Sequence, residues 1–309
     1  MNNHIKVIFF GTPQFAVESL EKLLAAGIHV AAVVTAPDKP GGRGMHLQAS
    51  AVKQCALKHQ IPIFQPTNLK NDQFIEQLRQ IKADLQVVIA FRMLPEAVWN
   101  MPPLGTINLH ASLLPDYRGA APINWAIING ETETGVSTFL LKHEIDTGDV
   151  IYQHKTAITP EMNAGELHDV LMEIGAEVTL KTVLAIASGQ YPKVQQGVSS
   201  HKLAPKIFTP DCTINWDKPG QSVQNLIRGL SPYPGAITYV GKTLIKIYKS
   251  RFEPENHHKK IGLLETEPGK NPYMRFTVPD GWIYAEDVQV EGKKRMLVGD
   301  LLRGWKPVV

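Results

Sequence analysis

The chain has 309 residues, which is more than one hydrophobic core usually supports and therefore predicts two domains. Its composition, 43% hydrophobic and 20% charged, is that of an ordinary soluble globular protein. No apolar run reaches the roughly 18 residues of a membrane span, and the N-terminal MNNHIKVIFFG lacks the features of a signal peptide. These features disfavour a membrane or secreted protein, and we expect a cytoplasmic one.

The cysteines and the charge distribution give two further expectations. Cys55 and Cys212 lie far apart, and no C-x-x-C or H-x-x-x-H spacing occurs, so we predict neither a disulfide nor a metal site. The net charge of +3 is concentrated in the C-terminal third, where residues 209–309 contain 15 Lys and Arg against 11 Asp and Glu. This excess fits a phosphate-facing surface, and an ordinary solubilising surface explains it about as well.

The N-terminal part alternates between strand-like and helical segments. A continuous apolar run at 6–10 is followed by Thr12 as a helix cap, by Pro13 in the first helical turn, and by apolar residues at helical spacing as far as Gly27. The same alternation predicts strands at 29–35, 61–65, 85–91, 106–110, 136–141 and 149–158, and helices at 50–59, 71–81, 120–130 and 163–189. This order predicts a Rossmann-like, doubly wound α/β domain over residues 1–189 with a mostly parallel sheet.

The character of the sequence changes after Gly189. Residues 190–206 are polar and contain proline, which predicts a linker. One short helix at 222–232 precedes short alternating runs at 236–240, 243–250, 274–278, 283–290 and 294–302. Gly, Pro and Asn separate these runs, a pattern typical of an all-β barrel, which we place at 207–309.

The first strand ends at a glycine, which raises the question of a dinucleotide site. The local sequence is G-T-P-Q-F-A rather than G-x-G-x-x-G. Pro13 and Phe15 stand where the backbone would have to approach a pyrophosphate, and this disfavours dinucleotide binding. The chain also contains neither a Walker lysine motif nor a G-x-S-x-G nucleophile elbow.

The stretch TINLHASLLPDYRG places polar side chains at the end of an apolar strand. Asn108 and His110 share one face because side chains alternate along a strand. A second polar loop, HEIDTGD at 143–149, places Asp146 and Asp149 beside a glycine turn. Open α/β sheets bind ligands at strand ends, so an Asp, a His and an Asn that converge there predict an acid–base and oxyanion site. The alternative is a buried Asn and His that backbone groups satisfy.

The pattern N-x-H-x-S-L-L-P-x-Y-R-G, followed by a D-x-G loop, resembles the folate-dependent formyltransferases. The resemblance covers essentially the whole chain. It includes GTPQFAVESL, the glycine-rich TAPDKPGGRGMHLQASAVK at 35–53 and LIRGLSPYPGA at 226–236. These segments favour the members of the family that act on methionyl initiator tRNA.

The resemblance implies a reaction and the roles of three residues. The formyl group of 10-formyltetrahydrofolate would pass to the α-amine of methionine on initiator tRNA. Asn108 would hold the tetrahedral oxyanion. His110 would supply a second donor and pass a proton toward the departing folate nitrogen. Asp146 would orient His110 and help to remove the amine proton. The resemblance requires no metal and no covalent intermediate, and it suggests a monomer.

The resemblance also implies binding residues. Folate would lie against Phe91, Arg92, Met93 and Leu94 and against the turn formed by Ser112, Leu113, Leu114 and Pro115. The glycine-rich loop would meet the acceptor end of the tRNA, chiefly through Arg43 and less through Lys39. The C-terminal domain would be OB-like and would dock the tRNA with Lys206, Arg228, Lys246 and Lys249. The alternatives are a strand exit into the core at 91–94, a solvated loop around Arg43 and ordinary surface lysines. Arg118 would either orient its loop or contact substrate.

Three rival functions remain open. A formyltransferase for amino-sugar nucleotides would share Asn108, His110 and Asp146, although the long PDKPGGRGMHL loop argues against it. A folate-binding hydrolase would discharge the formyl group to water. A non-catalytic nucleic-acid-binding module would rely on the C-terminal barrel, whose modest charge and lack of an aromatic–basic motif make it the weaker reading.

Overall fold

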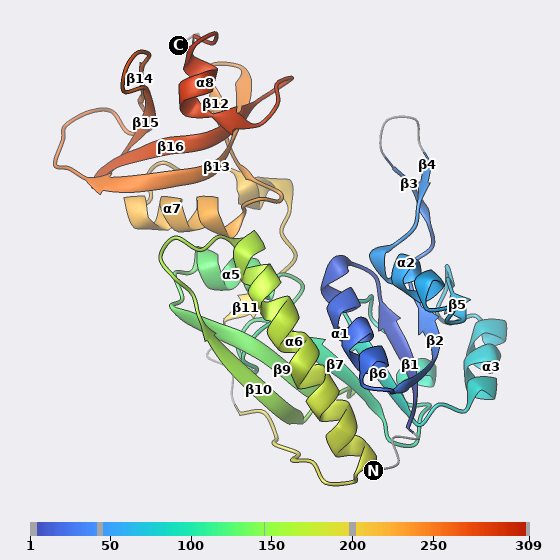
Figure 1. Cartoon of the computed structure of the whole chain (residues 1–309). Helices are drawn as coiled ribbons and strands as arrows, with labels where there is room; N and C mark the ends of the chain where they lie inside the picture. Colours follow the sequence, from blue (N-terminus) through green and yellow to red (C-terminus); the bar gives the residue numbers. More distant parts are fainter. Residues whose placement is uncertain (1–4, 42–45, 145, 198–201, 307–309) are drawn as a thin grey trace. The chain divides into compact units, whose positions relative to one another are not determined.

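The computed structural model describes residues 5–41, 46–144, 146–197 and 202–306, and the chain forms two compact units (Figure 1). The first unit comprises Met1–Gly119, Gly135–Thr156 and His168–Leu203, and the second comprises Ala120–Thr134, Ala157–Leu167 and Ala204–Val309. Both units are discontinuous in sequence, and the domain boundaries expected at 1–189, 190–206 and 207–309 stay a prediction. Among the described helices, none has both the length and the apolar character needed to span a bilayer.

A seven-stranded sheet forms the centre of the first unit, in the order β10-β9-β7-β6-β1-β2-β5. Neighbouring strands from β7 through β6, β1 and β2 to β5 pair in parallel, and β9 pairs antiparallel to β7. The predicted mostly parallel α/β sheet is confirmed. The strands are β1 Lys6–Gly11, β2 His29–Val34, β5 Ile63–Phe64, β6 Leu85–Ile89, β7 Thr106–His110, β9 Glu133–Leu140 and β10 Val150–Ala157.

Local side-chain chemistry fixes the ends of the helices in this unit. The Ser50 hydroxyl caps α2 by accepting from Lys53 N at 3.0 Å, and Asn71 caps α3 in the same way. Gly27, at φ +75°, ends α1 as predicted. The predicted cap at Thr12 is wrong, because Pro13 takes the cap position with an extended backbone and no side-chain bond. The helices are α1 Gln14–Ala25, α2 Ala51–Lys58, α3 Asp72–Ile81, α4 Glu96–Trp99 and α6 Ala164–Ala187, of which α6 also reaches into the second unit.

Helices pack on both faces of the sheet. On one face, Phe10 of β1 and Val88 of β6 pack in one cluster with Phe74 of α3. On the other face, α6 comes so close to β7 that a Cβ at Gly175 would lie 2.7 Å from Leu109 Cδ2. Val88 is in register with Asn108, so Asn108 and His110 lie on the face opposite α6.

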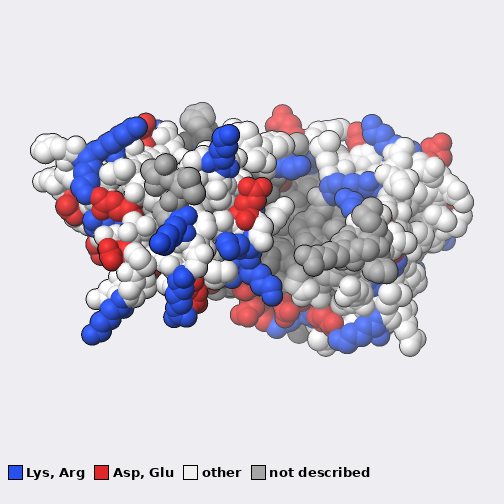
Figure 2. All heavy atoms as spheres, turned by 90° about the horizontal axis from the view of Figure 1, so that it is seen from above, with Lys and Arg blue, Asp and Glu red and all other residues white. Residues whose placement is uncertain are grey.

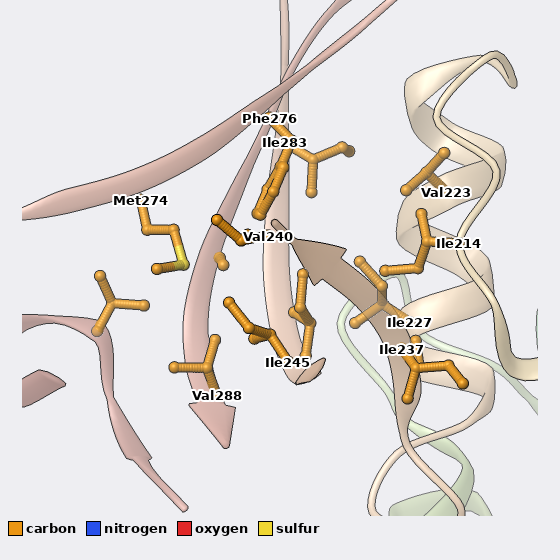
Figure 3. Packing of buried hydrophobic residues seen from close by; sticks show 14 of the residues in the cluster. Ile214, Val223, Ile227, Ile237, Val240, Ile245, Met274, Phe276, Ile283 and Val288 are labelled. Atoms are coloured by element: carbon orange, nitrogen blue, oxygen red, sulfur yellow. The ribbon is translucent and has the colours of Figure 1, made fainter. Parts of the chain in front are cut away.

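The second unit is built on an antiparallel sheet in the order β12-β13-β16-β15-β14, with β17 paired to β16. Figure 3 shows Val223 and Ile227 of α7 pointing toward Ile237 and Ile245 of this sheet, and all four side chains are buried. The predicted antiparallel all-β unit is confirmed, while its OB-like character stays a prediction. Its elements are α5 Pro122–Ile128, the 3-10 turn Thr209–Cys212, α7 Gly220–Gly229, β12 Ala236–Val240, β13 Thr243–Pro254, β14 Leu264–Glu267, β15 Tyr273–Val278, β16 Gly281–Val290, β17 Met296–Leu297 and α8 Val298–Leu302.

Two segments differ from the sequence prediction. The run at 294–302 was expected as a strand, but only β17 is extended and Val298–Leu302 is the helix α8. Short apolar runs satisfy strand and helix spacing equally, which explains this error. At the two ends of the glycine-rich segment, which was expected as a loop, Lys39–Gly41 (β3) and His46–Gln48 (β4) pair antiparallel, while residues 42–45 lie outside the described residues. The short strands β8 Arg118–Gly119 and β11 Leu203–Ala204 also pair with each other.

Candidate active site

The side chain of Asn108 is available to a ligand. Its backbone is held between Val88 of β6 and Phe139 of β9, in the interior of the sheet. Its side chain is half-buried, and within the described part of the chain its amide has no hydrogen-bond partner. A rigid strand therefore presents an amide with two unused N–H donors and one unused oxygen.

The imidazole of His110 is held in one orientation. It is only 7% exposed, and its Nε2 lies 2.8 Å from the carbonyl oxygen of Tyr117. A carbonyl can only accept, so Nε2 carries the proton and donates it. The Nδ1 atom faces Asp146, whose Oδ2 lies 3.9 Å away. Nδ1 is therefore the ring atom that can exchange a proton with other groups.

Asp146 reaches His110 by way of a returning loop. Because β9 runs antiparallel to β7, it ends beside Ile107 rather than beside His110. The chain then returns along the sheet, and Asp146 Oδ2 accepts from Gly119 N at 3.1 Å. The Asp146 side chain is 11% exposed, and its backbone has the left-handed φ of +54°. Gly148 permits this path because a Cβ there would overlap the carbonyl oxygen of Leu140.

The structure adds Gln196 to this site, a residue that sequence reasoning missed. Gln196 Nε2 donates to the carbonyl oxygens of Asp146 and Gly148, each at 2.8 Å. Its Oε1 accepts from Arg118 Nε at 3.1 Å and from the terminal guanidinium nitrogen Nη2 at 2.6 Å. Arg118, whose role the sequence left open, therefore binds the residue that holds the Asp146 loop. Gln196 lies in the segment predicted as a linker, and no local pattern marks it.

A buried hydrogen-bond network fixes the turn that follows His110. Ser137, fully buried on β9, donates to Ser112 O at 2.6 Å and accepts from Leu114 N at 3.0 Å. Gln153 Nε2 donates to Leu114 O at 2.9 Å and to the Ser137 hydroxyl at 2.8 Å. Ser112 itself donates to Asp116 O at 2.7 Å. Ser137 and Gln153 were also missed from sequence, because both are polar positions inside segments whose pattern indicates strands.

The predicted folate residues at 91–94 differ in what they offer. Leu94 is 7% exposed and belongs to the sheet core, so its side chain has a structural role. Arg92 donates to the backbone carbonyls of Pro66 and Thr67, at 2.9 Å for Thr67. Met93 is 76% exposed, and the half-buried Phe91 packs edge-on against a core phenylalanine. Met93 is thus the most exposed apolar side chain of this set, while the Arg92 guanidinium carbon lies over the half-buried Phe91 ring, 5.7 Å from its centroid.

The predicted turn residues Leu113, Leu114 and Pro115 show a similar division. Leu114 is buried in a small cluster with Phe139 and Val150, and both of its backbone polar groups are bonded as described. Leu113 and Pro115 are half-buried. The turn is therefore rigid, and it offers surface at Leu113 and Pro115 rather than at Leu114.

The four basic residues predicted in the second unit divide into two pairs. Lys206 is exposed, with its Nζ 5.4 Å from the Phe208 ring, and Lys249 is 65% exposed with Glu286 at 3.4 Å. Lys246 donates to Pro234 O at 2.8 Å. Arg228 donates to Met162 O at 2.9 Å and to Asn225 Oδ1 at 3.0 Å, and burial lowers the pKa of its guanidinium.

Basic residues are mixed with acidic ones on the face of the molecule seen in Figure 2. Lys39 on β3 is exposed, and Arg43 lies outside the described residues. Lys39, Lys206 and Lys249 are therefore the predicted cations with side chains open to solvent in the described part of the chain.

One group of potential metal ligands was not anticipated. Glu21, Cys55 and His59 bring their ligand atoms within 4.8 Å of one another, since Cys55 and His59 are four residues apart at the end of α2. Burial, followed by the charge of Glu21, raises the pKa of the Cys55 thiol to about 12, and Lys58 donates to Glu21 at 3.0 Å. The three side chains are joined by hydrogen bonds, since Cys55 Sγ donates to Glu21 Oε1 at 3.5 Å and His59 Nε2 lies 2.7 Å from Glu21 Oε2. The absence of a metal stays a prediction.

An amide, an imidazole and a carboxylate meet at the end of one strand of an open α/β sheet, an arrangement suited to acid–base and acyl-transfer chemistry. Family comparison specifies this class. Residues 4–183 match the family described as Formyl transferase, and residues 206–306 match the Formyl transferase, C-terminal domain. The chain belongs to the formyl transferase family.

Individual relatives agree with this assignment. The chain is 50% identical over 310 residues to the methionyl-tRNA formyltransferase of Bacteroides fragilis, covering 97% of this chain and 95% of that protein. It is 48% identical to the Bacteroides thetaiotaomicron protein of the same name, over 98% and 96% of the two chains. The N-formyltransferase of Helicobacter canadensis, solved with folinic acid and dTDP-3-aminofucose, shares the fold with a TM-score of 0.66 at 23% identity, over 91% of this chain and 98% of that chain.

Proposed function

We propose that the chain transfers the formyl group of 10-formyltetrahydrofolate to the α-amino group of methionyl initiator tRNA, the step that prepares this tRNA for translation initiation. The observation that carries the proposal is the near-full-length identity, at 50%, to a protein named for this activity. The unpartnered Asn108 amide beside the oriented His110–Asp146 pair supports it, since formyl transfer needs an oxyanion donor and an acid–base group.

Asn108 supplies the oxyanion contact. The amine attacks the formyl carbon, and the carbonyl oxygen becomes a tetrahedral oxyanion. The Asn108 amide N–H groups have no other partner in the described residues, and they stabilise that charge from a strand that does not reorganise. Removing one oxyanion donor typically lowers the rate by about 10²–10³.

His110 and Asp146 handle the protons. Because Nε2 is committed to the Tyr117 carbonyl, proton exchange takes place at Nδ1, on the side that Asp146 faces. Nδ1 accepts the proton that the attacking amine loses, and Asp146 stabilises the imidazolium that results. Nδ1 then delivers this proton to the folate nitrogen as the bond from that nitrogen to the formyl carbon breaks. This assignment refines the role expected from sequence, since the second oxyanion donor has to be the protonated Nδ1 rather than Nε2.

Folate and tRNA bind through the surfaces that remain open. Phe91, Met93 and the half-buried Leu113 and Pro115 contact the folate, which is a formyl-donating cosubstrate. The Helicobacter canadensis N-formyltransferase, which shares this fold, was solved with folinic acid. Arg43 and Lys39 contact the acceptor end of the tRNA, and Lys206 and Lys249 contact its backbone. The protein acts in the cytoplasm, where tRNA is charged, and as a monomer.

An acceptor panel tests the proposal. The purified protein and 10-formyltetrahydrofolate are offered methionyl initiator tRNA, methionyl elongator tRNA, free methionine and a UDP-amino-sugar. Formyl transfer to the initiator tRNA alone is the expected result. Transfer to the sugar nucleotide would overturn the acceptor and keep the catalytic residues, while release of formate without any acceptor would instead indicate a hydrolase.

A further inference from the structure

We propose that Gln196 is a positioning residue for the reaction: it holds the Asp146 loop so that the carboxylate faces Nδ1 of His110 and stabilises the imidazolium. The inference rests on the proposed function. None of the hydrogen bonds of Gln196 to described residues goes to the ring of His110 or to the carboxylate of Asp146. It binds the backbone on both sides of the Asp146 turn instead, through the carbonyl oxygens of Asp146 and Gly148.

The backbone at Asp146 needs such support. A φ of +54° is a conformation that residues other than glycine adopt rarely, and it persists where the surroundings hold it. Gln196 holds this turn with two hydrogen bonds of 2.8 Å, one to each of the carbonyl oxygens of Asp146 and Gly148. Gly148 has no Cβ, and this lets the chain pass close to Leu140 O. Gln196 thus binds the turn at both of its ends.

Only an amide fits the position of Gln196. Its nitrogen faces two carbonyl oxygens, which need a donor, and its oxygen faces the Arg118 guanidinium, which needs an acceptor. A carboxylate of the same size would keep the Arg118 contact and would repel the two carbonyl oxygens. The difference between a glutamine and a glutamate at this position therefore separates positioning from simple packing.

We call Gln196 with its four hydrogen bonds the clamp. The clamp also binds Arg118, which belongs to the segment 117–119 that contacts both His110 and Asp146. Arg118 lies between Tyr117, whose carbonyl oxygen accepts from His110 Nε2, and Gly119, whose N–H donates to Asp146 Oδ2. Gln196 joins this segment to the turn at 146–148. A closed set of hydrogen bonds therefore sets the 3.9 Å between His110 Nδ1 and Asp146 Oδ2.

The test compares Gln196→Ala and Gln196→Glu with a matched control, Gln195→Ala, which changes the exposed neighbouring glutamine. We expect kcat for formyl transfer to fall roughly 10²-fold in both Gln196 variants, the size expected for a misplaced catalytic group. KM for tRNA and for 10-formyltetrahydrofolate should stay within about threefold, and Tm should match that of the control. Wild-type kcat in Gln196→Glu, or an effect confined to either KM, would overturn the positioning role.

A second measurement keeps the inference separate from the proposed function. Amide hydrogen exchange of the peptide that contains Asp146 needs no substrate, and it should be faster in Gln196→Ala than in wild type and in Gln195→Ala. Unchanged exchange there would overturn the clamp even if the enzyme formylates tRNA. If wild type formylated no acceptor while exchange rose as expected, the proposed function would fail and the clamp on Asp146 would stand.

Discussion

Asp146 approaches His110 on the side of Nδ1, while the carbonyl of Tyr117 occupies Nε2 on the other side of the ring. The backbone carbonyl of Tyr117 fixes the orientation of the imidazole. The carboxylate of Asp146 stabilises the positive charge that the ring carries when both nitrogens hold a proton. At 3.9 Å the carboxylate attracts an imidazolium without forming a hydrogen bond. A small approach of the two groups during the reaction would therefore strengthen the interaction where charge develops.

Replacing Asn108 with alanine should lower kcat/KM for formyl transfer by about 10²–10³, because one oxyanion donor is lost. Folding should be intact, since the side chain is half-buried and has no partner among the described residues. Steady-state kinetics with methionyl initiator tRNA, together with Tm, measures both effects. Asn100→Ala, an exposed asparagine at the end of α4, serves as the control. Near-wild-type turnover in Asn108→Ala would remove the oxyanion role.

Asp146 and Asp149 offer a matched pair within one loop. Asp146→Ala should reduce turnover by more than 10²-fold, since it removes the carboxylate that stabilises His110. Asp149 pairs with Lys142 at 2.8 Å, and Asp149→Ala should leave turnover within a few-fold of wild type. Single-turnover rates with saturating tRNA isolate the chemical step. Equal losses in the two variants would mean that the loop acts through its shape rather than through the Asp146 carboxylate.

Much of this site could be predicted from the sequence because it depends on local periodicity. Two-residue alternation in TINLH places Asn108 and His110 on one face, and the glycine turn in HEIDTGD marks Asp146 and Asp149 as loop acids, of which the family resemblance selects Asp146. Both statements concern neighbours in the chain. The structure brings these three residues together as expected.

The rest depends on contacts between distant segments, which leave no periodic signal. Gln196 binds a turn 48 to 50 residues away, and Ser137 binds a turn 23 to 25 residues away. The antiparallel direction of β9 could not be predicted from the sequence either, because the same apolar run fits a parallel or an antiparallel neighbour. Lys39–Gly41 and His46–Gln48 likewise pair as strands, although the composition of this segment indicated a loop.

Arg43 tests the contribution of the glycine-rich loop to acceptor binding. Arg43→Ala should lower kcat/KM for methionyl initiator tRNA and leave KM for 10-formyltetrahydrofolate unchanged. If Arg43 neutralises one phosphate, the slope of the logarithm of the tRNA-binding constant against the logarithm of the salt concentration should become shallower by roughly one unit in the variant. Lys70→Ala removes an equal charge from an exposed position outside the predicted surfaces and serves as the control. A normal kcat/KM for tRNA in Arg43→Ala would exclude this residue.

Arg228 and Lys249 should separate structural from RNA-facing basic residues. Arg228→Met should lower the free energy of unfolding by about 2 kcal/mol, because buried oxygens at Met162 and Asn225 lose a charged donor. Lys249→Ala should change stability by less than about 0.5 kcal/mol and should weaken tRNA binding in low salt. Denaturant unfolding and salt titrations measure the two effects. Weaker tRNA binding at unchanged stability in Arg228→Met would assign that residue to the RNA surface.

Glu265 should make the stability of the second unit depend on pH. The Lys259 ammonium lowers the pKa of this carboxyl, burial opposes the shift, and Arg275 on the neighbouring strand lowers it further. A carboxyl whose pKa is lower in the folded chain stabilises the fold fully above its unfolded pKa of about 4.3, and this contribution disappears as the pH falls through the folded value. Glu265→Gln should therefore lower the free energy of unfolding by up to about 1 kcal/mol at pH 7, and by progressively less below pH 4. Unfolding by urea at pH 7 and pH 3 measures both costs. A cost for Glu265→Gln that is the same at the two pH values would mean that packing, rather than the charge on Glu265, stabilises this pair of strands.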